Sequence, residues 1–170
     1  YASKKILDKK PNNIIPFLKK IFKNVSYKTI SKQKLHSQSI STHVGILAKR
    51  KKVREIINIL QKKIIKKNKR ICVEGRDIAS KILKKNPKYD YAFYFKCNLK
   101  TASYRRWKDL KKKVSLKEVE KTLRQRTILD KSRKHSPLVK VKDAYLIRTD
   151  KLNKTQMIKK MSNIIEKNEQ

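Results

Sequence analysis

The chain has 170 residues, of which 38% are hydrophobic, and this is enough for one folded domain with its own core. No apolar run reaches membrane-spanning length and no signal-peptide pattern is present, so we expect a cytoplasmic protein without a membrane partner. The formal net charge of +36 suits nonspecific binding to nucleic acid.

Lysine supplies most of this charge. The chain has 39 lysines, spread through every segment, and only ten arginines. Such a spread indicates a general lysine bias more than a designed binding stripe. A guanidinium binds phosphate or carboxylate through a rigid two-pronged donor that lysine cannot imitate. The arginines are therefore the better indicators of a functional site.

The first part of the chain is predicted to be mainly helical. Helices are expected at residues 2–10 and 14–22, followed by a short strand at 25–30 and a polar loop at 31–41. A helical period returns from Thr42 and continues, after a lysine-rich break, to Ile64. Arg54 lies beside the apolar stripe of this last stretch, where it can reach the edge of a pocket.

Strands then alternate with helices. The expected strands are 71–73, 91–95 and 144–148, and the expected helices are 99–112, 115–133 and 154–166, with a short helix or extended run at 78–83. Ser115 with Glu118 forms a capping box. The alternation indicates an α/β fold with a largely parallel sheet. Cys72 and Cys97 lack metal-ligand spacing and are expected to be reduced core thiols.

The tripeptide Gly75-Arg76-Asp77 follows the predicted strand at 71–73. Ligands of open α/β sheets bind at the carboxyl ends of strands. Taken alone, however, the tripeptide is better interpreted as a surface turn with a local ion pair.

Three charged residues share one face of the predicted helix at 115–133. Arg126, Asp130 and Arg133 stand at positions i, i+4 and i+7, each within reach of the next. An aspartate between two arginines would be held ionised and would orient both guanidiniums. The alternative is a solvated ladder of ion pairs, worth tenths of a kcal/mol.

The order and spacing of these motifs together resemble the nucleoside monophosphate kinases, specifically the bacterial-type cytidylate kinases. The matching residues run through most of the chain and include Ala48, Val53, Arg54, Gln61, Gly75, Arg76, Asp77, Ile78, Tyr104, Arg105, Arg106, Ser115, Leu116, Arg126, Asp130, Arg133, Ser136, Pro137, Leu138, Asp143 and Ala144.

The resemblance implies a P-loop nucleoside monophosphate kinase fold, with a parallel sheet flanked by helices in a single domain. A shortened substrate-binding insertion would span about 11–45 and a lid region about 99–133. The implied reaction is the phosphorylation of CMP and dCMP by ATP with Mg²⁺, in a monomer, with no metal ligand in this chain.

The resemblance also implies how cytosine would be read. The pairing edge of cytosine offers an amino donor and then two acceptors. In the family, Asp77 stands at the position that faces the amine and Arg54 at the position that faces the acceptors. Uracil would turn a carbonyl toward Asp77 and should be disfavoured, because two acceptors would then oppose each other in a buried site.

Six further residues receive roles from the resemblance. Arg76 and Arg133 match positions that hold the monophosphate, and Arg126 and Asp130 match positions that meet the sugar. Arg105 and Arg106 match lid arginines that close over the ATP phosphates and, with Arg133, neutralise charge on the transferred group.

The chain departs from the family pattern in one important respect. Its glycines are Gly45 and Gly75, so it contains no Gly-x-x-x-x-Gly-Lys loop for ATP. We expect an N-terminal truncation that removes the first strand and this loop, and a chain that does not catalyse alone. Gly45 stands where the family has a base-contacting serine, and Ala102 replaces a lid arginine. A basic nucleic-acid-binding protein and a kinase for another monophosphate are the alternative hypotheses.

Overall fold

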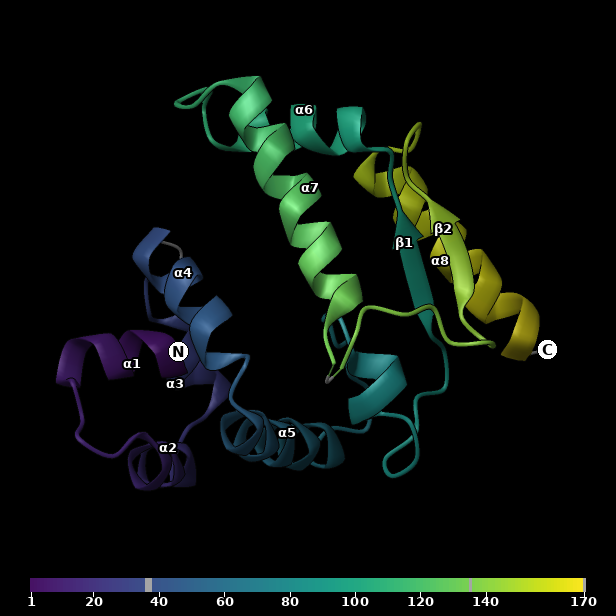
Figure 1. Cartoon of the computed structure of the whole chain (residues 1–170). Coiled ribbons are helices and arrows are strands. Elements are labelled where there is room, and N and C mark those ends of the chain that lie inside the picture. Colours follow the sequence, from purple (N-terminus) through teal and green to yellow (C-terminus); the bar gives the residue numbers. More distant parts are fainter. Residues whose placement is uncertain (36–37, 135, 170) are drawn as a thin grey trace. The chain divides into compact units, whose positions relative to one another are not determined.

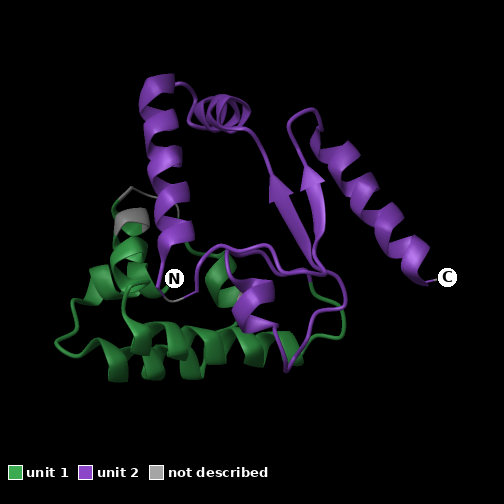
Figure 2. Cartoon of the chain, turned by 45° about the vertical axis from the view of Figure 1, so that its right-hand side comes forward, with its two compact units in different colours: residues 1–71 green, residues 72–170 purple. Residues whose placement is uncertain are grey.

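The structure is a computed structural model that describes residues 1–35, 38–134 and 136–169 (Figure 1). It divides into two compact units, Tyr1–Ile71 and Cys72–Gln170 (Figure 2). None of the helices among the described residues is long and apolar enough to cross a membrane.

The first unit is helical. Its helices are α1 (Ala2–Lys9), α2 (Ile14–Lys23), α3 (Tyr27–Ser31), α4 (Gln38–Leu47) and α5 (Lys51–Lys66). Helix α1 packs against α4 and α2 packs against α5. Their apolar faces meet in a core of Ile6, Leu18, Leu47 and Val53. The helices predicted at 2–10 and 14–22, and the helical period from Thr42 to Ile64, are therefore confirmed.

The strand predicted at 25–30 is wrong, because these residues lead into helix α3. The Ser26 hydroxyl accepts a hydrogen bond from Thr29 N at 3.2 Å and lies 2.9 Å from Thr29 Oγ1. This N-cap satisfies backbone donors that a strand would have to pair elsewhere. The loop predicted at 31–41 is also partly wrong, since α4 begins at Gln38. Residues 36 and 37 of that loop lie outside the described residues.

The second unit contains the sheet. Its elements are η1 (Ile78–Ile82), β1 (Phe93–Lys96), α6 (Leu99–Asp109), α7 (Leu116–Ser132), β2 (Tyr145–Arg148) and α8 (Lys154–Glu169). Strands β1 and β2 pair in parallel, with Phe93 opposite Tyr145. Helix α8 lies along β2 (Figure 1), and the Tyr145 hydroxyl is 3.3 Å from Asn168 Oδ1. Parallel pairing with helical crossovers confirms the predicted α/β class.

Side-chain caps set the start of the two helices that follow β1. Asn98 Oδ1 accepts a hydrogen bond from Thr101 N at 2.7 Å and so begins α6. Ser115 Oγ accepts one from Glu118 N at 3.2 Å and so begins α7. Helices α6 and α7 pack against each other. Both predicted starts are confirmed, because a cap depends only on residues three apart in the sequence.

The buried strand predicted at 71–73 is absent from the described residues. Ile71 is 44% exposed and no strand is formed there. A strand needs a neighbour to pair its N–H and C=O groups, and the sheet in the described part of the chain consists of β1 and β2. For the same reason Cys72 is an exposed thiol, not the core thiol predicted, while Cys97 is half-buried.

Candidate active site

A buried carboxylate on the last turns of α7 gathers three arginines. Asp130 is 1% exposed. Its Oδ2 lies 3.3 Å from Arg76 Nε and 3.8 Å from Arg126 Nε, and its Oδ1 pairs with Arg133 Nη2. The prediction that Arg126 and Arg133 both reach Asp130 is confirmed, although α7 ends at Ser132 and Arg133 is its C-cap residue. These four residues, Arg76, Arg126, Asp130 and Arg133, are called the arginine cluster below.

Arg76 joins the cluster from a distant part of the sequence. The turn before it is tight at Gly75, where a Cβ atom would lie 2.6 Å from Ile78 Cγ1. The C-terminal end of α7 is held by the segment that follows it, since the Asp130 carbonyl accepts a hydrogen bond from Leu138 N at 2.7 Å. The sequence did not predict that Arg76 pairs with Asp130, because no local spacing connects the two residues.

The cluster carries excess positive charge. Three guanidiniums surround one carboxylate, and their side chains remain 43%, 62% and 33% exposed for Arg76, Arg126 and Arg133. The pKa of Arg126 is lowered by partial burial, then by the positive charges of Arg76, Arg133 and Arg106, against the opposing charge of Asp130. An anion bound here would relieve this repulsion.

The guanidiniums keep donors for such an anion. Within the described residues neither oxygen of Asp130 has a well-aligned hydrogen bond, and its contacts with Arg76 and Arg126 are long ion pairs. An arginine has five N–H donors in a planar fork, and one loose ion pair leaves most of them for a ligand. The arrangement therefore suits a phosphate group that accepts several charged hydrogen bonds.

The adjacent arginines of α6 differ in their surroundings. Arg105 Nη2 donates to the carbonyl oxygens of Thr149 at 2.8 Å, Leu152 at 3.1 Å and Asp150 at 3.3 Å. Arg106 is exposed, and its charge acts on Arg126. The sequence analysis predicted the same role for Arg105 and Arg106. It did not predict that Arg105 would contact the turn at Thr149–Leu152.

The predicted base-reading residues lie in different units. Arg54 is half-buried on α5 in the first unit, and Asp77 is half-buried immediately before η1 in the second. The reading of cytosine by these two side chains stays a prediction.

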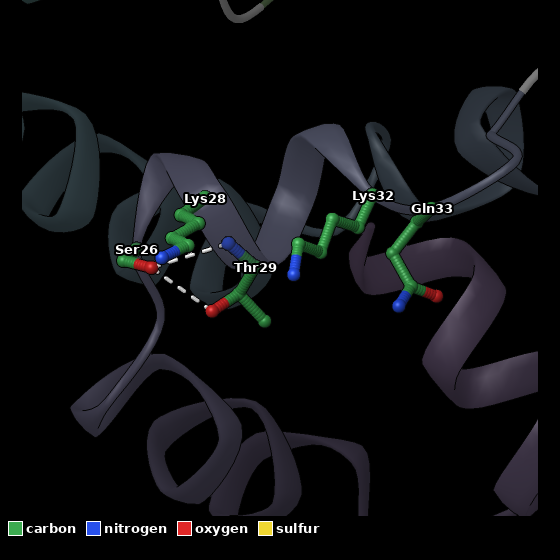
Figure 3. A pocket seen from close by; sticks show the side chains of 5 residues that line it. All are labelled: Ser26, Lys28, Thr29, Lys32 and Gln33. Carbon is green, nitrogen blue, oxygen red and sulfur yellow. Dashed lines mark hydrogen bonds between the residues drawn. The ribbon is translucent and has the colours of Figure 1, made fainter.

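A shallow pocket of about 310 Å³ lies beside α3 (Figure 3), lined by Ser26, Lys28, Thr29, Lys32 and Gln33. The Ser26 and Thr29 hydroxyls are engaged with each other in the cap of α3.

Among the described residues no group of three or more His, Cys, Asp or Glu side chains could hold a metal ion.

The fold places this chain among α/β proteins with a parallel sheet, and the cluster gives it three arginines around one carboxylate. Comparisons with known proteins narrow this class of protein. A family model described as cytidylate kinase matches residues 11–167. A cytidylate kinase of Clostridium botulinum (strain Okra / Type B1) is 34% identical over 131 residues, which cover 75% of this chain and 58% of that protein.

Two further relatives agree. The cytidylate kinase of Caldanaerobacter subterraneus is 31% identical over 139 residues, covering 80% of this chain and 60% of the relative. That of Alkaliphilus oremlandii is 31% identical over 136 residues, covering 78% and 61%. The chain belongs to the cytidylate kinase family, and its fold is that of the P-loop nucleoside monophosphate kinases. It spans about three fifths of the length of these relatives.

Proposed function

We propose that the protein transfers the γ-phosphoryl group of ATP to CMP or dCMP. A phosphate oxygen of CMP forms a bond to the γ-phosphorus, the bond to the bridging oxygen of ADP breaks, and the products are CDP and ADP. The observation that carries this proposal is the arginine cluster, in which three partly exposed guanidiniums surround a buried carboxylate.

Arg76 and Arg133 are proposed to hold the monophosphate of the acceptor. They contact different oxygens of Asp130, Arg76 at Oδ2 and Arg133 at Oδ1. Two forks fixed in this way can bind a phosphate and orient the attacking oxygen, which lowers the entropic part of the barrier. Arg126 and Asp130 complete the site, and the sugar of CMP is proposed to lie against them.

Arg106 is proposed to act from α6 on the phosphates of ATP. Charge spreads over the transferred group in the transition state, and a guanidinium near it stabilises that charge. Its exposure leaves it accessible to a nucleotide. The matching role predicted for Arg105 has less support, since the Arg105 guanidinium donates to three carbonyl oxygens.

ATP and Mg²⁺ are proposed as the donor and the metal ion, as the family implies. Among the described residues no group of three or more His, Cys, Asp or Glu side chains could hold a metal ion, and Mg²⁺ is proposed to bind mainly through the phosphates of ATP. The 170 residues also contain no Gly-x-x-x-x-Gly-Lys sequence. Binding of CMP needs neither a metal-ligand cluster nor this sequence. CMP binding is therefore a sharper test of the proposal than turnover of ATP.

Calorimetric titration of the chain with CMP, dCMP, UMP and inorganic phosphate tests the proposal. CMP and dCMP should bind in one site at physiological salt, and UMP at least about tenfold more weakly, because it opposes a carbonyl to Asp77. Turnover is then measured on the gene product that carries these residues, with ATP as donor. Equal affinity for CMP and UMP would contradict the cytosine-reading pair.

The same titrations with a short single-stranded RNA distinguish the proposed kinase from the alternative, a basic nucleic-acid-binding protein. A charge of +36 gives salt-sensitive, sequence-independent binding in any case. Sequence preference that survives physiological salt, together with no binding of CMP, would favour a nucleic-acid-binding protein instead.

A further inference from the structure

The neighbouring arginines of α6 contact different parts of the second unit. The Arg105 guanidinium points to the turn that follows β2, where Nη2 has the carbonyl oxygens of Thr149, Asp150 and Leu152 within 2.8 to 3.3 Å. Arg105 Nη1 also lies 3.9 Å from Cys97 Sγ, at the end of β1. These contacts span the carboxyl ends of both strands.

A second contact joins the start of α6 to the turn that follows β2. The backbone N–H of Asn98, the N-cap of α6, donates to Asp150 Oδ1 at 2.6 Å. This hydrogen bond is the largest cause that lowers the pKa of the Asp150 carboxyl from its ordinary value. Thr149 N in turn donates to Lys96 O at 2.9 Å. The start of α6 is thus held to the end of β2 by its backbone cap and, two turns later, by the Arg105 side chain.

A phosphate contact through Nη2 would require Arg105 to give up this arrangement. Carbonyl oxygens are acceptors that a guanidinium satisfies well, and three of them converge on one nitrogen here. If Arg105 left, these oxygens would lose a charged donor inside a tight turn. Arg105 and Arg106 are both exposed, but within the described residues the Arg106 side chain donates no such hydrogen bond to a backbone carbonyl.

We propose that Arg105 is a positioning residue, which fixes the first turns of α6 on the turn after β2 so that Arg106 is presented to the nucleotide phosphates. The inference rests on the proposed function for the role of Arg106, but the anchoring contacts of Arg105 do not depend on it. Arg105 then acts through α6 and does not touch ATP.

Amide hydrogen exchange tests the anchor directly. Arg105→Lys keeps the charge, but the lysine Nζ stands one bond short of the position of Nη2, on which the three carbonyl oxygens converge. The amides of Asn98, Thr149 and Leu152 should therefore exchange about tenfold faster. Arg106→Lys is the matched control one position along the helix, and it should leave these amides unchanged. Wild-type exchange in Arg105→Lys would overturn the proposal, because a positive charge alone would then suffice.

Kinetics on the gene product that carries these residues test the division of roles. Arg105→Lys should lower kcat with the KM for ATP within about twofold of wild type, whereas loss of a phosphate ligand in Arg106→Lys should raise that KM. A raised KM for ATP in Arg105→Lys, with unchanged exchange, would make Arg105 a nucleotide ligand instead. If the wild type neither binds CMP nor turns over, the proposed function fails, and the exchange comparison still decides whether Arg105 is an anchor.

Discussion

Arg76 Nε lies 3.3 Å from Oδ2 of Asp130, and this ion pair joins the turn after Gly75 to the last turns of α7. The carboxylate is 1% exposed while the guanidinium is 43% exposed. The buried partner therefore sets the position of the exposed one. Asp130 gathers Arg126 and Arg133 in the same way, so that one side chain organises all the guanidiniums of the arginine cluster.

Asp130→Asn should weaken both the fold and the proposed acceptor site. The substitution keeps the shape of the side chain but removes the charge that opposes three guanidiniums. Because the arginines are partly hydrated, we expect a loss of about 1.5–3 kcal/mol in the free energy of unfolding. Denaturant unfolding measures this loss, and titration with CMP should show weaker binding.

Glu120→Gln is the matched control for Asp130→Asn. It removes an exposed ion pair on the same helix, in which Arg124 Nη2 lies 3.3 Å from Glu120 Oε1. Its effect should stay below about 0.5 kcal/mol. Equal effects of the two substitutions would contradict an organising role for Asp130.

Arg133→Lys should impair acceptor binding while the chain stays folded. A lysine cannot reproduce a bidentate phosphate contact and also pair with Asp130, so CMP affinity and kcat/KM should each fall by about tenfold or more. Arg124→Lys on the same helix serves as the control, because Arg124 pairs with Glu120 at the surface. Near-normal values for Arg133→Lys would remove Arg133 from the proposed phosphate site.

Asp77→Asn should change the choice of base. The carboxylate is proposed to accept a hydrogen bond from the cytosine amine, whereas an amide can also donate to the uracil carbonyl. The ratio of CMP to UMP affinity should therefore fall by about tenfold or more. Asp90→Asn, an exposed aspartate of the same unit, should leave the ratio as it is. If the ratio of CMP to UMP affinity is unaltered in Asp77→Asn, residues other than Asp77 must recognise the base.

Tyr89 and Asp143 form a pH-dependent link within the second unit. The Tyr89 hydroxyl donates to Asp143 Oδ1 at 2.7 Å. Burial, the hydrogen bond and the negative charge of Asp143 together raise the pKa of Tyr89 to about 12. The same hydrogen bond is the largest cause that lowers the pKa of the Asp143 carboxyl.

The sign of the stability effect follows from these shifts. A raised tyrosine pKa means that the link stabilises the fold below the unfolded pKa of about 10, and that this contribution is lost as pH rises to about 12. At the acid end, the contribution of Asp143 is lost as pH falls below its ordinary pKa. The stability difference between wild type and Tyr89→Phe should thus be largest near neutral pH and disappear at both extremes.

Absorbance titration of the phenolates provides the direct measurement. Tyr89→Phe should remove one phenol that ionises with a pKa near 12. Asp143→Asn should lower that pKa only in part, because burial of Tyr89 remains in the variant. A full return to the ordinary tyrosine pKa in Asp143→Asn would show that Asp143 alone causes the shift.

Most helices could be predicted because their signals are local. Asn98 and Ser115 cap the backbone three residues ahead, and the apolar period of residues 53–64 repeats within one helix. The run at 71–73 misled the prediction, since β-branched residues favour a strand only where a neighbouring strand is present. Ser26 was a cap of the same kind as Ser115, but the alternating residues after it favoured a strand.

The sequence by itself determined that Arg126 and Asp130 share a face of α7 and that Arg133, which follows the helix directly, is within reach of Asp130, because helical spacing is fixed by the backbone. It also carried enough matching motifs to indicate the family. Only the tertiary structure decided that Arg76 completes the cluster and that Arg105 turns to the carbonyl oxygens after β2. Contacts between distant segments depend on how helices and strands pack, and no spacing along the chain encodes that packing.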